Sequence, residues 1–415
     1  MKIEEVVIWP IDIPLRFAFK HSLAKRTASE SIIVKITFDN AISGYGEALP
    51  RHYVTGETVV SCITAIRQFI LPRLAGLEFA EVGDVRTAIF GLHDDPAVAT
   101  SPAAICAVEL ALLDGLARSN KQALYEFLGQ PRKVERVRYS MVLGSSSLKT
   151  IRKLTWFTRL IGINHIKLKV GTSSEENEAA IRLVRKIHPH AVLRIDANCA
   201  WTVESAMDQL DRLRRYGVVA CEQPLPKSEI AGNRRLLARY PEMLFFMDES
   251  LCSYHDAEML IQEQAATGFN IRISKNGGLL NAMRIYDLAK RNGIKCQLGA
   301  QVGETAIIAA AGRLFAGMTG DLCFHEGSFG THLLQADVTR RPYRFGFGGK
   351  ASTHCQGAGI GVEIVGDHIK PFAGTPVVIT SDDLRCASTI PTAAGVALTS
   401  AAYRHQEQQA YSNAH

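Results

Sequence analysis

Residues 165–198 read HIKLKVGTSSEENEAAIRLVRKIHPHAVLRIDAN. A short strand-like run at 165–170 is followed by a stretch with apolar residues at helical spacing, and then by a second strand-like run at 192–197. Strand–helix–strand segments of this kind are the building unit of parallel α/β folds. The stretch therefore predicts one unit of a repeating βα architecture.

The same alternation continues through the chain after Gly129, at intervals of roughly 25 residues. Eight strand-like runs can be counted, at residues 137–143, 165–170, 192–197, 219–222, 244–248, 269–274, 295–298 and 321–324. Eight βα units close into a barrel, and barrel enzymes carry their chemistry on the loops that follow the strands. Polar residues at the carboxyl ends of these runs are therefore the candidates for function.

The chain before this repeat has a different pattern. Residues 3–15 and 31–38 are strand-like, and Gly44-Tyr45-Gly46 predicts a turn after them. The polar, basic segment 17–26 predicts a loop, which either closes over a site or is simply solvated. Residues 59–128 have helical spacing, most clearly in PAAICAVELALLDGLARSN. We expect an antiparallel sheet packed against helices.

The composition excludes several classes of protein. Of 415 residues, 47% are hydrophobic and 21% charged, which is typical of a globular enzyme, and the net charge of +6 is too mild and too scattered for nucleic-acid binding. No run of 18 apolar residues predicts a membrane span, and the N-terminus does not resemble a signal peptide. Nine cysteines without zinc-type spacing predict reduced thiols and a cytoplasmic protein.

The run at 165–170 contains Lys167-Leu168-Lys169. Because side chains alternate along a strand, both ammonium groups face the same side, which in a barrel is the interior. Like charge and partial desolvation both lower a lysine pKa, and a lowered pKa suits a general base near neutral pH. Taken alone, the pair is equally compatible with an exposed strand edge.

Each of the next three runs carries a carboxylate at its end. Asp196, Glu222 and Asp248 are separated by 26 residues in both intervals. One acid per successive strand end predicts convergence above the barrel mouth, and three oxygen ligands suit a hard cation such as Mg²⁺. Each acid alone could instead cap a helix. Their regular spacing favours the metal site.

These motifs resemble the enolase superfamily, in the branch that contains mandelate racemase, muconate lactonising enzymes and dipeptide epimerases. The resemblance runs from residue 1 to about residue 370. It is carried by Gly44-Tyr45-Gly46-Glu47, AAICAVELALLDGLARSNKQALYEFLG, Lys167-x-Lys169, Asp196-Ala-Asn198 with Trp201, Glu222-Gln-Pro, Asp248-Glu-Ser and Lys275-Asn-Gly-Gly.

The resemblance implies an α/β fold, a (β/α)₇β TIM-type barrel with an α+β capping domain. We expect the capping domain in residues 1–130, the barrel in 131–340, a return segment to the capping domain in 341–380, and a partly disordered tail in 381–415. The family also implies Mg²⁺ as cofactor, a small carboxylate substrate and a homo-oligomer.

The same resemblance assigns roles to the residues already singled out. It places the metal on Asp196, Glu222 and Asp248, and it makes Lys169 the acid/base with Lys167 as a charge beside the substrate. Asp248 rather than its neighbour Glu249 is chosen on the resemblance alone.

Two strands depart from the family pattern. The resemblance implies a second lysine on the sixth strand, as in the muconate lactonising and epimerase members of the family. This chain has Arg272 at that position, and arginine does not release its proton at ordinary pH. Two-base racemisation would then need another partner, such as Lys275. On the eighth strand, the Asp-x-Asp pair of dipeptide epimerases is replaced by a segment in which Glu326 alone remains to hold a cationic group. His325 beside it fits core packing as well as it fits a role in the site.

The seventh strand lacks the histidine of the mandelate racemase type and continues as GAQVGE at 299–304. Gln301 is a candidate for substrate binding there, and Glu304 is expected to begin the next helix or to line the pocket.

Specificity in this family comes from loops of the capping domain. The matching stretches are 20–26 and 51–55, which are basic or aromatic, or else simply solvated. The substrate-binding candidates from these loops and from the strand ends are Lys20, His21, Arg51, Tyr53, Asn198 and Lys275.

The sequence leads to one hypothesis and two alternatives. Lys169 moves a proton α to a substrate carboxylate through an enediolate, and Arg272 acts as an electrostatic or substrate-binding group, as in a muconate cycloisomerase-like isomerase or a lyase. The first alternative is an epimerase or racemase of amino-acid derivatives or dipeptides. The second is a non-catalytic barrel used for binding, which the three mutually repelling acids disfavour.

Overall fold

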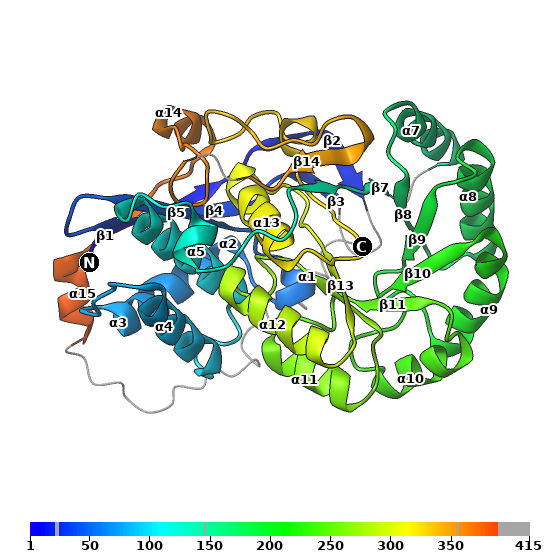
Figure 1. The fold of residues 1–415 in the computed structure, drawn as a ribbon, viewed down its shortest axis with the longest axis horizontal. Coiled ribbons are helices and arrows are strands. Elements are labelled where there is room, and N and C mark those ends of the chain that lie inside the picture. The colour runs from blue at the N-terminus through cyan, green and yellow to red at the C-terminus, as the bar shows by residue number, and fades with distance from the viewer. Residues whose placement is uncertain (21–24, 145–146, 355–356, 389–415) are drawn as a thin grey trace, which may run out of the picture.

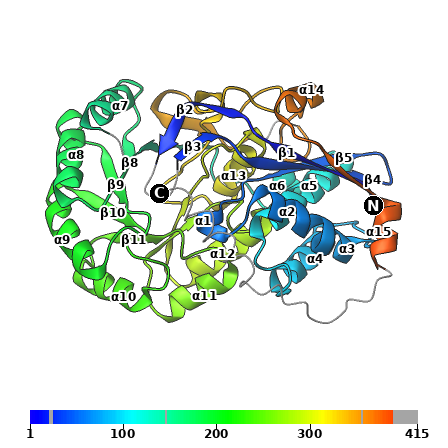
Figure 2. The same cartoon turned by 180° about the vertical axis from the view of Figure 1, so that it is seen from behind.

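The computed structural model describes residues 1–20, 25–144, 147–354 and 357–388. Figures 1 and 2 show a barrel on one side of the molecule and a sheet packed with helices on the other. Among the described residues, none of the helices combines the length and the apolar character that a membrane span requires.

A four-stranded antiparallel sheet forms the base of the capping domain, in the order β15-β1-β4-β5. Its strands are β1 (Ile3–Ile11), β4 (Ser31–Phe38), β5 (Ser43–Ala48) and β15 (Val377–Thr380). The predicted antiparallel sheet is confirmed. Because β15 pairs with β1, the chain comes back to this sheet after it has completed the barrel.

The helices of the N-terminal part of the chain accompany this sheet. They are α1 (His52–Thr55), α2 (Val59–Ala65), α3 (Leu71–Leu74), α4 (Val82–Asp94), α5 (Pro102–Ser119) and α6 (Leu124–Phe127). Helix α5 packs directly on β5, where an ideal Cβ on Gly46 would lie 1.9 Å from the carbonyl oxygen of Ala107. The turn predicted at residues 44–46 is wrong, because these glycines lie inside a strand and allow the helix to approach it.

Seven parallel strands run in sequence around the barrel. They are β7 (Met141–Leu143), β8 (His165–Lys169), β9 (Val192–Asp196), β10 (Val218–Glu222), β11 (Leu244–Met247), β12 (Gly268–Ile271) and β13 (Lys295–Leu298). The helices that follow them are α7 (Leu148–Leu160), α8 (Ser174–Ile187), α9 (Val203–Leu213), α10 (Ile230–Arg239), α11 (Tyr254–Gln262), α12 (Leu279–Arg291) and α13 (Ala306–Thr319). Figure 1 shows α7 to α11 as an outer ring. The predicted TIM-type barrel is confirmed.

The eighth predicted run, 321–324, does not form a regular strand, yet it closes the circle. The Cys323 N–H donates to the Cys296 carbonyl at 2.8 Å, and His325 pairs with Leu298 in a parallel bridge. On its other side, the Ser140 N–H donates to the His325 carbonyl at 2.8 Å, immediately before β7. The eighth run therefore joins the seventh strand to the first.

The first predicted run, 137–143, is two strands rather than one. β6 (Arg136–Arg138) pairs with β14 (Lys350–Ser352) in a separate two-stranded sheet, and β7 alone enters the barrel. A continuous β-rich sequence does not reveal where the chain changes sheets, because the change is set by the partner strand.

Two further segments differ from expectation. The basic segment predicted as a loop belongs largely to a hairpin of β2 (Pro14–Lys20) and β3 (Lys25–Ala28). The predicted tail begins with a helix, α15 (Ser381–Ser388), and its remainder lies outside the described residues. A short helix, α14 (Gly366–Ile369), precedes the return to the sheet.

Candidate active site

The three acids predicted as metal ligands stand at neighbouring strand ends. Asp196 is the last residue of β9, and its register partner Glu222 is the last residue of β10. Asp248 directly follows β11. All three side chains are buried. The parallel sheet thus brings residues that are far apart in sequence to one edge of the barrel.

Carboxylates surround the ammonium group of Lys167. Its Nζ atom lies 2.9 Å from Glu222 Oε1 and 2.8 Å from Glu326 Oε2. Asp196 Oδ2 is 3.6 Å away. Burial lowers the pKa of Lys167, but the negative charges of these three acids outweigh burial and raise the pKa above its ordinary value. The expectation of a lowered pKa is therefore wrong for Lys167.

Lys169 is the more accessible of the two lysines. Its Nζ atom lies 2.9 Å from Asp196 Oδ2 and 2.5 Å from Asn198 Oδ1, and 11% of its side chain is exposed, compared with 2% for Lys167. Burial raises the pKa of Asp196, but the charges of the two lysines lower it, and the net pKa lies below the usual range. Lys169 is thus the lysine that a substrate at the barrel mouth can reach.

Two cations hold Asp248. The guanidinium of Arg272 contacts Asp248 Oδ2 and lies 3.6 Å from Glu222 Oε1, while Lys275 Nζ lies 2.9 Å from Asp248 Oδ1. Burial lowers the pKa of Arg272, but the charges of Asp248 and Glu222 raise it by more than burial lowers it. The net pKa of Arg272 therefore lies above the ordinary value. Arg272 therefore stays charged and cannot serve as a base.

Glu249 lies next to Asp248 and is buried at the same edge of the barrel. One of its oxygens accepts a hydrogen bond from Asn198 Nδ2 at 3.0 Å, while Oε2 is buried and has no hydrogen-bond partner among the residues that the structure describes. Burial, together with the charges of Asp248 and Asp196, raises the pKa of Glu249 to about 7. A buried carboxylate oxygen without a donor fits as a ligand of a hard divalent cation.

The three acids are paired with cations. Among the residues that the structure describes, no three His, Cys, Asp or Glu side chains form a ready-made metal site. Lysine and arginine head groups contact the acids, as Lys167 does with Asp196 and Glu222. Because a buried carboxylate is costly unless it is paired, these cations balance the charge of the acids. The assignment of Mg²⁺ to Asp196, Glu222 and Asp248 stays a prediction.

The substrate-binding candidates of the capping domain lie in different surroundings. Arg51 is 1% exposed, and its guanidinium donates to the backbone carbonyls of Ser29, Glu30, Pro50 and Val302. The structure therefore places Arg51 as a buried link between loops, and not as a group that faces a substrate. Tyr53 is half-buried beneath Arg26, whose guanidinium carbon lies 5.6 Å from the ring centroid. The side chain of Lys20 and the whole of His21 lie outside the described residues.

Two candidates from the last strands are also buried. Glu326 is already paired with two cations, Lys167 and Arg194, the latter at 3.0 Å. It is therefore not a free carboxylate for a substrate ammonium group. Gln301 Oε1 is buried, and none of the residues that the structure describes donates a hydrogen bond to this amide oxygen.

Sequence reasoning missed the polar residues that support Glu222 from inside the barrel. Asn270 donates to Glu222 Oε1 at 2.9 Å and Gln297 donates to Glu222 Oε2 at 2.6 Å. Arg194 in turn donates to Gln297 at 2.6 Å. Arg194 and Asn270 each stand two residues before a residue of the site, so the alternation that paired the lysines was the signal that could have found them.

The sequence matches two family descriptions. Residues 3–129 match "Mandelate racemase / muconate lactonizing enzyme, N-terminal domain", and residues 156–368 match "Enolase C-terminal domain-like". Together these matches span both the capping domain and the barrel.

Individual relatives agree with this result. L-Ala-D/L-Glu epimerase from Bacillus subtilis is 30% identical over 321 residues, which cover 76% of this chain and 85% of that protein. The crystal structure of N-succinyl Arg/Lys racemase from Bacillus cereus has a TM-score of 0.83 at 25% identity and covers 91% of this chain and 100% of its own. The dipeptide epimerase from Cytophaga hutchinsonii, complexed with Mg and the dipeptide D-Ala-L-Val, has a TM-score of 0.81 at 26% identity, with 92% and 100% covered.

Proposed function

The chain belongs to the mandelate racemase/muconate lactonizing enzyme family of the enolase superfamily, and on that premise we propose that it moves a proton next to the carboxylate of a small substrate, with Mg²⁺ as cofactor. It is an enzyme, of the isomerase or lyase kind that its relatives represent.

The position of Lys169 is the observation that carries this proposal. It ends β8, is a register partner of Asp196, and keeps part of its side chain exposed at the barrel mouth. In its neutral form the Lys169 amine would take the proton from the α-carbon of the substrate. Lys167, whose pKa is raised by the acids around it, would remain charged and attract the negative charge that develops on the carboxylate.

Asp196, Glu222 and Asp248 are the residues that would hold Mg²⁺. Glu249 supports this assignment, because its buried Oε2 has no hydrogen-bond partner among the described residues and lies at the same strand end as Asp248. When bound, the ion would supply positive charge that stabilises the enediolate form of the substrate.

The product depends on whether a second group transfers a proton. Arg272 is not a base, and Lys275 is fully buried against Asp248. If Lys169 acts alone, the expected chemistry is cycloisomerisation or β-elimination. The second candidate is an epimerase or racemase of dipeptides or amino-acid derivatives, because several relatives are epimerases or racemases of such compounds. Homo-oligomerisation and a cytoplasmic location remain predictions.

The test is turnover of defined compounds with and without Mg²⁺. L-Ala-L-Glu, N-succinyl-L-arginine, cis,cis-muconate and a set of hydroxy acids would be followed by optical rotation and by product mass. Conversion that requires Mg²⁺ and disappears in Lys169→Ala is expected. Unchanged conversion in Lys169→Ala would refute the proposal. The matched control is Lys290→Ala, which removes an exposed lysine of α12 that is paired with Asp321.

A further inference from the structure

Glu304 lies on the loop between β13 and α13, at the carboxyl end of the barrel. Its Oε1 atom accepts a hydrogen bond from the Gln301 backbone N–H at 2.6 Å. Within the described residues, its Oε2 atom has no recorded hydrogen-bond donor, and the side chain is only half-buried. One oxygen is therefore fixed in place, while the other is free to gain or lose a proton.

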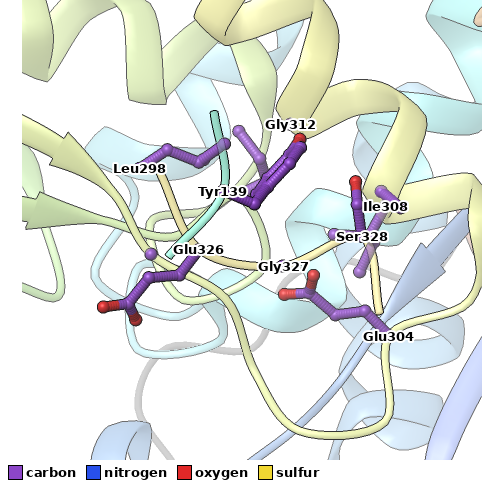
Figure 3. A pocket seen from close by; sticks show the side chains of 11 residues that line it. Tyr139, Leu298, Glu304, Ile308, Gly312, Glu326, Gly327 and Ser328 are labelled. Atoms are coloured by element: carbon purple, nitrogen blue, oxygen red, sulfur yellow. The ribbon is translucent and has the colours of Figure 1, made fainter. Parts of the chain in front are cut away.

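Glu304 lines a small cavity of about 10 Å³, which has room for about one water molecule. Figure 3 shows Glu304 and Glu326 on either side of Gly327 in the wall of this cavity. Gly327 has a φ of +109° and lacks a side chain, and an ideal Cβ there would lie 3.6 Å from Glu304 Oε2. The backbone conformation thus keeps the space next to the carboxyl open.

Glu304 also belongs electrostatically to the site. Burial raises its pKa to about 8, and the charge of Glu47 acts in the same direction, while Arg272 and Arg51 act against it. The side chain of Arg272 lies against Gly299, which lines the same cavity. Near neutral pH the carboxyl therefore carries a proton much of the time, as a proton donor must.

Glu304 and Lys169 stand at different places on the barrel rim. Lys169 is the last residue of β8, and Glu304 follows β13. Around the rim, the shorter way from β8 to β13 passes β7 and the closing run, which makes three steps from one strand to the next. In a circle of eight, four steps would place them directly opposite. The two residues therefore lie on different sides of the rim.

We propose that Glu304 is a second proton-transfer residue, which delivers a proton to the substrate from the side of the rim away from Lys169. This inference rests on the proposed function and deepens it, because a second donor makes the enzyme an epimerase or racemase at the carbon next to the carboxylate. A carboxylic acid would then take the place of the lysine that Arg272 replaces.

Two proton transfers make up the reaction. The Lys169 amine takes the α-proton, and the electron pair of the C–H bond enters the π bond of the enediolate. That pair then forms a new C–H bond on the other face, as the O–H bond of Glu304 breaks and its proton moves to carbon. Lys169 is left as an ammonium group and Glu304 as a carboxylate, and both return to their starting state by exchange with solvent.

The experiment uses the full chain with Mg²⁺ in D₂O, and L-Ala-L-Glu and N-succinyl-L-arginine as probes. Chiral chromatography with mass detection separates deuterium in inverted product from deuterium in recovered substrate. The wild type should place deuterium in inverted product. Glu304→Gln, which preserves the acceptor for the Gln301 N–H, should invert at least about 100-fold more slowly while it still washes deuterium into substrate of unchanged configuration. Glu263→Gln, an exposed carboxyl paired with Arg234, is the control.

The two proposals fail in different ways. Deuterium exchange that persists in Lys169→Ala overturns the proposed function, whereas inversion by Glu304→Gln within about twofold of the wild type overturns the role of Glu304. Infrared titration gives a readout that needs no substrate, since the wild type minus Glu304→Gln difference should contain a carboxylic C=O band that disappears near pH 8. Absence of that band, or conversion of muconate without any effect of Glu304→Gln, would also overturn the inference.

Discussion

The Nζ atom of Lys275 lies 2.9 Å from Oδ1 of Asp248, and neither side chain is exposed to solvent. The same ammonium group donates to the backbone carbonyls of Asp248 and Asn270, at 2.7 and 2.9 Å. All three of its N–H donors are therefore used within the protein. Lys275 holds the end of β11 to the end of β12, and it is not the substitute for the lysine that the sixth strand lacks.

Replacing Lys275 with Met is expected to destabilise the fold by about 3–5 kcal/mol, because it leaves the Asp248 carboxylate buried without one of its cations. Urea unfolding at neutral pH measures this loss. Lys290→Met is the matched control, since its pair with Asp321 is about half exposed on both sides and should cost at most about 1 kcal/mol. Equal losses in the two variants would contradict the assignment.

Mg²⁺ is expected to stabilise the protein in thermal unfolding, by about 2.7 kcal/mol when its concentration is 100 times the Kd. Asp196→Asn should abolish that gain, because it removes a carboxylate from the predicted ligand set. Asp208→Asn removes an exposed carboxylate paired with Arg212 and should leave the gain unchanged. A wild-type unfolding temperature that is the same in Mg²⁺ and in EDTA would argue against a metal site.

Glu109 should make stability depend on pH. This carboxylate of α5 accepts a hydrogen bond from the Leu280 N–H at the start of α12, and burial raises its pKa from 4.5 to about 8. Because the folded state binds the proton more tightly than the unfolded state, stability should fall as pH rises from about 5 to about 8, at about 1.4 kcal/mol per pKa unit.

Unfolding of the wild type and of Glu109→Gln at pH 6 and pH 9 tests this dependence. The variant should lack the part of the alkaline loss that Glu109 causes, so that the difference between the two proteins changes with pH. A difference that stays constant between the two pH values would show that Glu109 does not titrate in this range.

Gly46→Ala should be strongly destabilising, by about 1–3 kcal/mol or more, because its Cβ would collide with the carbonyl oxygen of Ala107 in α5. Gly91→Ala is the opposite case. Gly91 lies inside α4, and apart from its own helix backbone no heavy atom of the described residues comes within 4 Å of its ideal Cβ, so alanine there should stabilise by about 0.5–1 kcal/mol. Thermal unfolding of both variants would reveal the difference in sign, and two changes of the same sign would contradict it.

The sequence by itself determined the elements that depend on local patterns. The period of two along a strand placed Lys167 and Lys169 on one side, and the repeat of βα units placed Asp196 and Glu222 at adjacent strand ends. The order of the strands, the barrel and the antiparallel sheet of the capping domain follow from these patterns, since hydrophobic periodicity and chain connectivity are properties of neighbouring residues.

Only the tertiary structure decided which charged groups meet. Arg51 is predicted to bind the substrate from a capping-domain loop, but its guanidinium donates to the carbonyl of Val302, which is 251 residues away. The pKa of Lys167 is predicted to be lowered by the neighbouring lysine, but the charge of Glu326, on the closing run, helps to raise it. Burial and Coulomb energies depend on distances in space, which a linear pattern does not contain, and for that reason the free oxygen of Glu304 becomes visible only in the folded barrel.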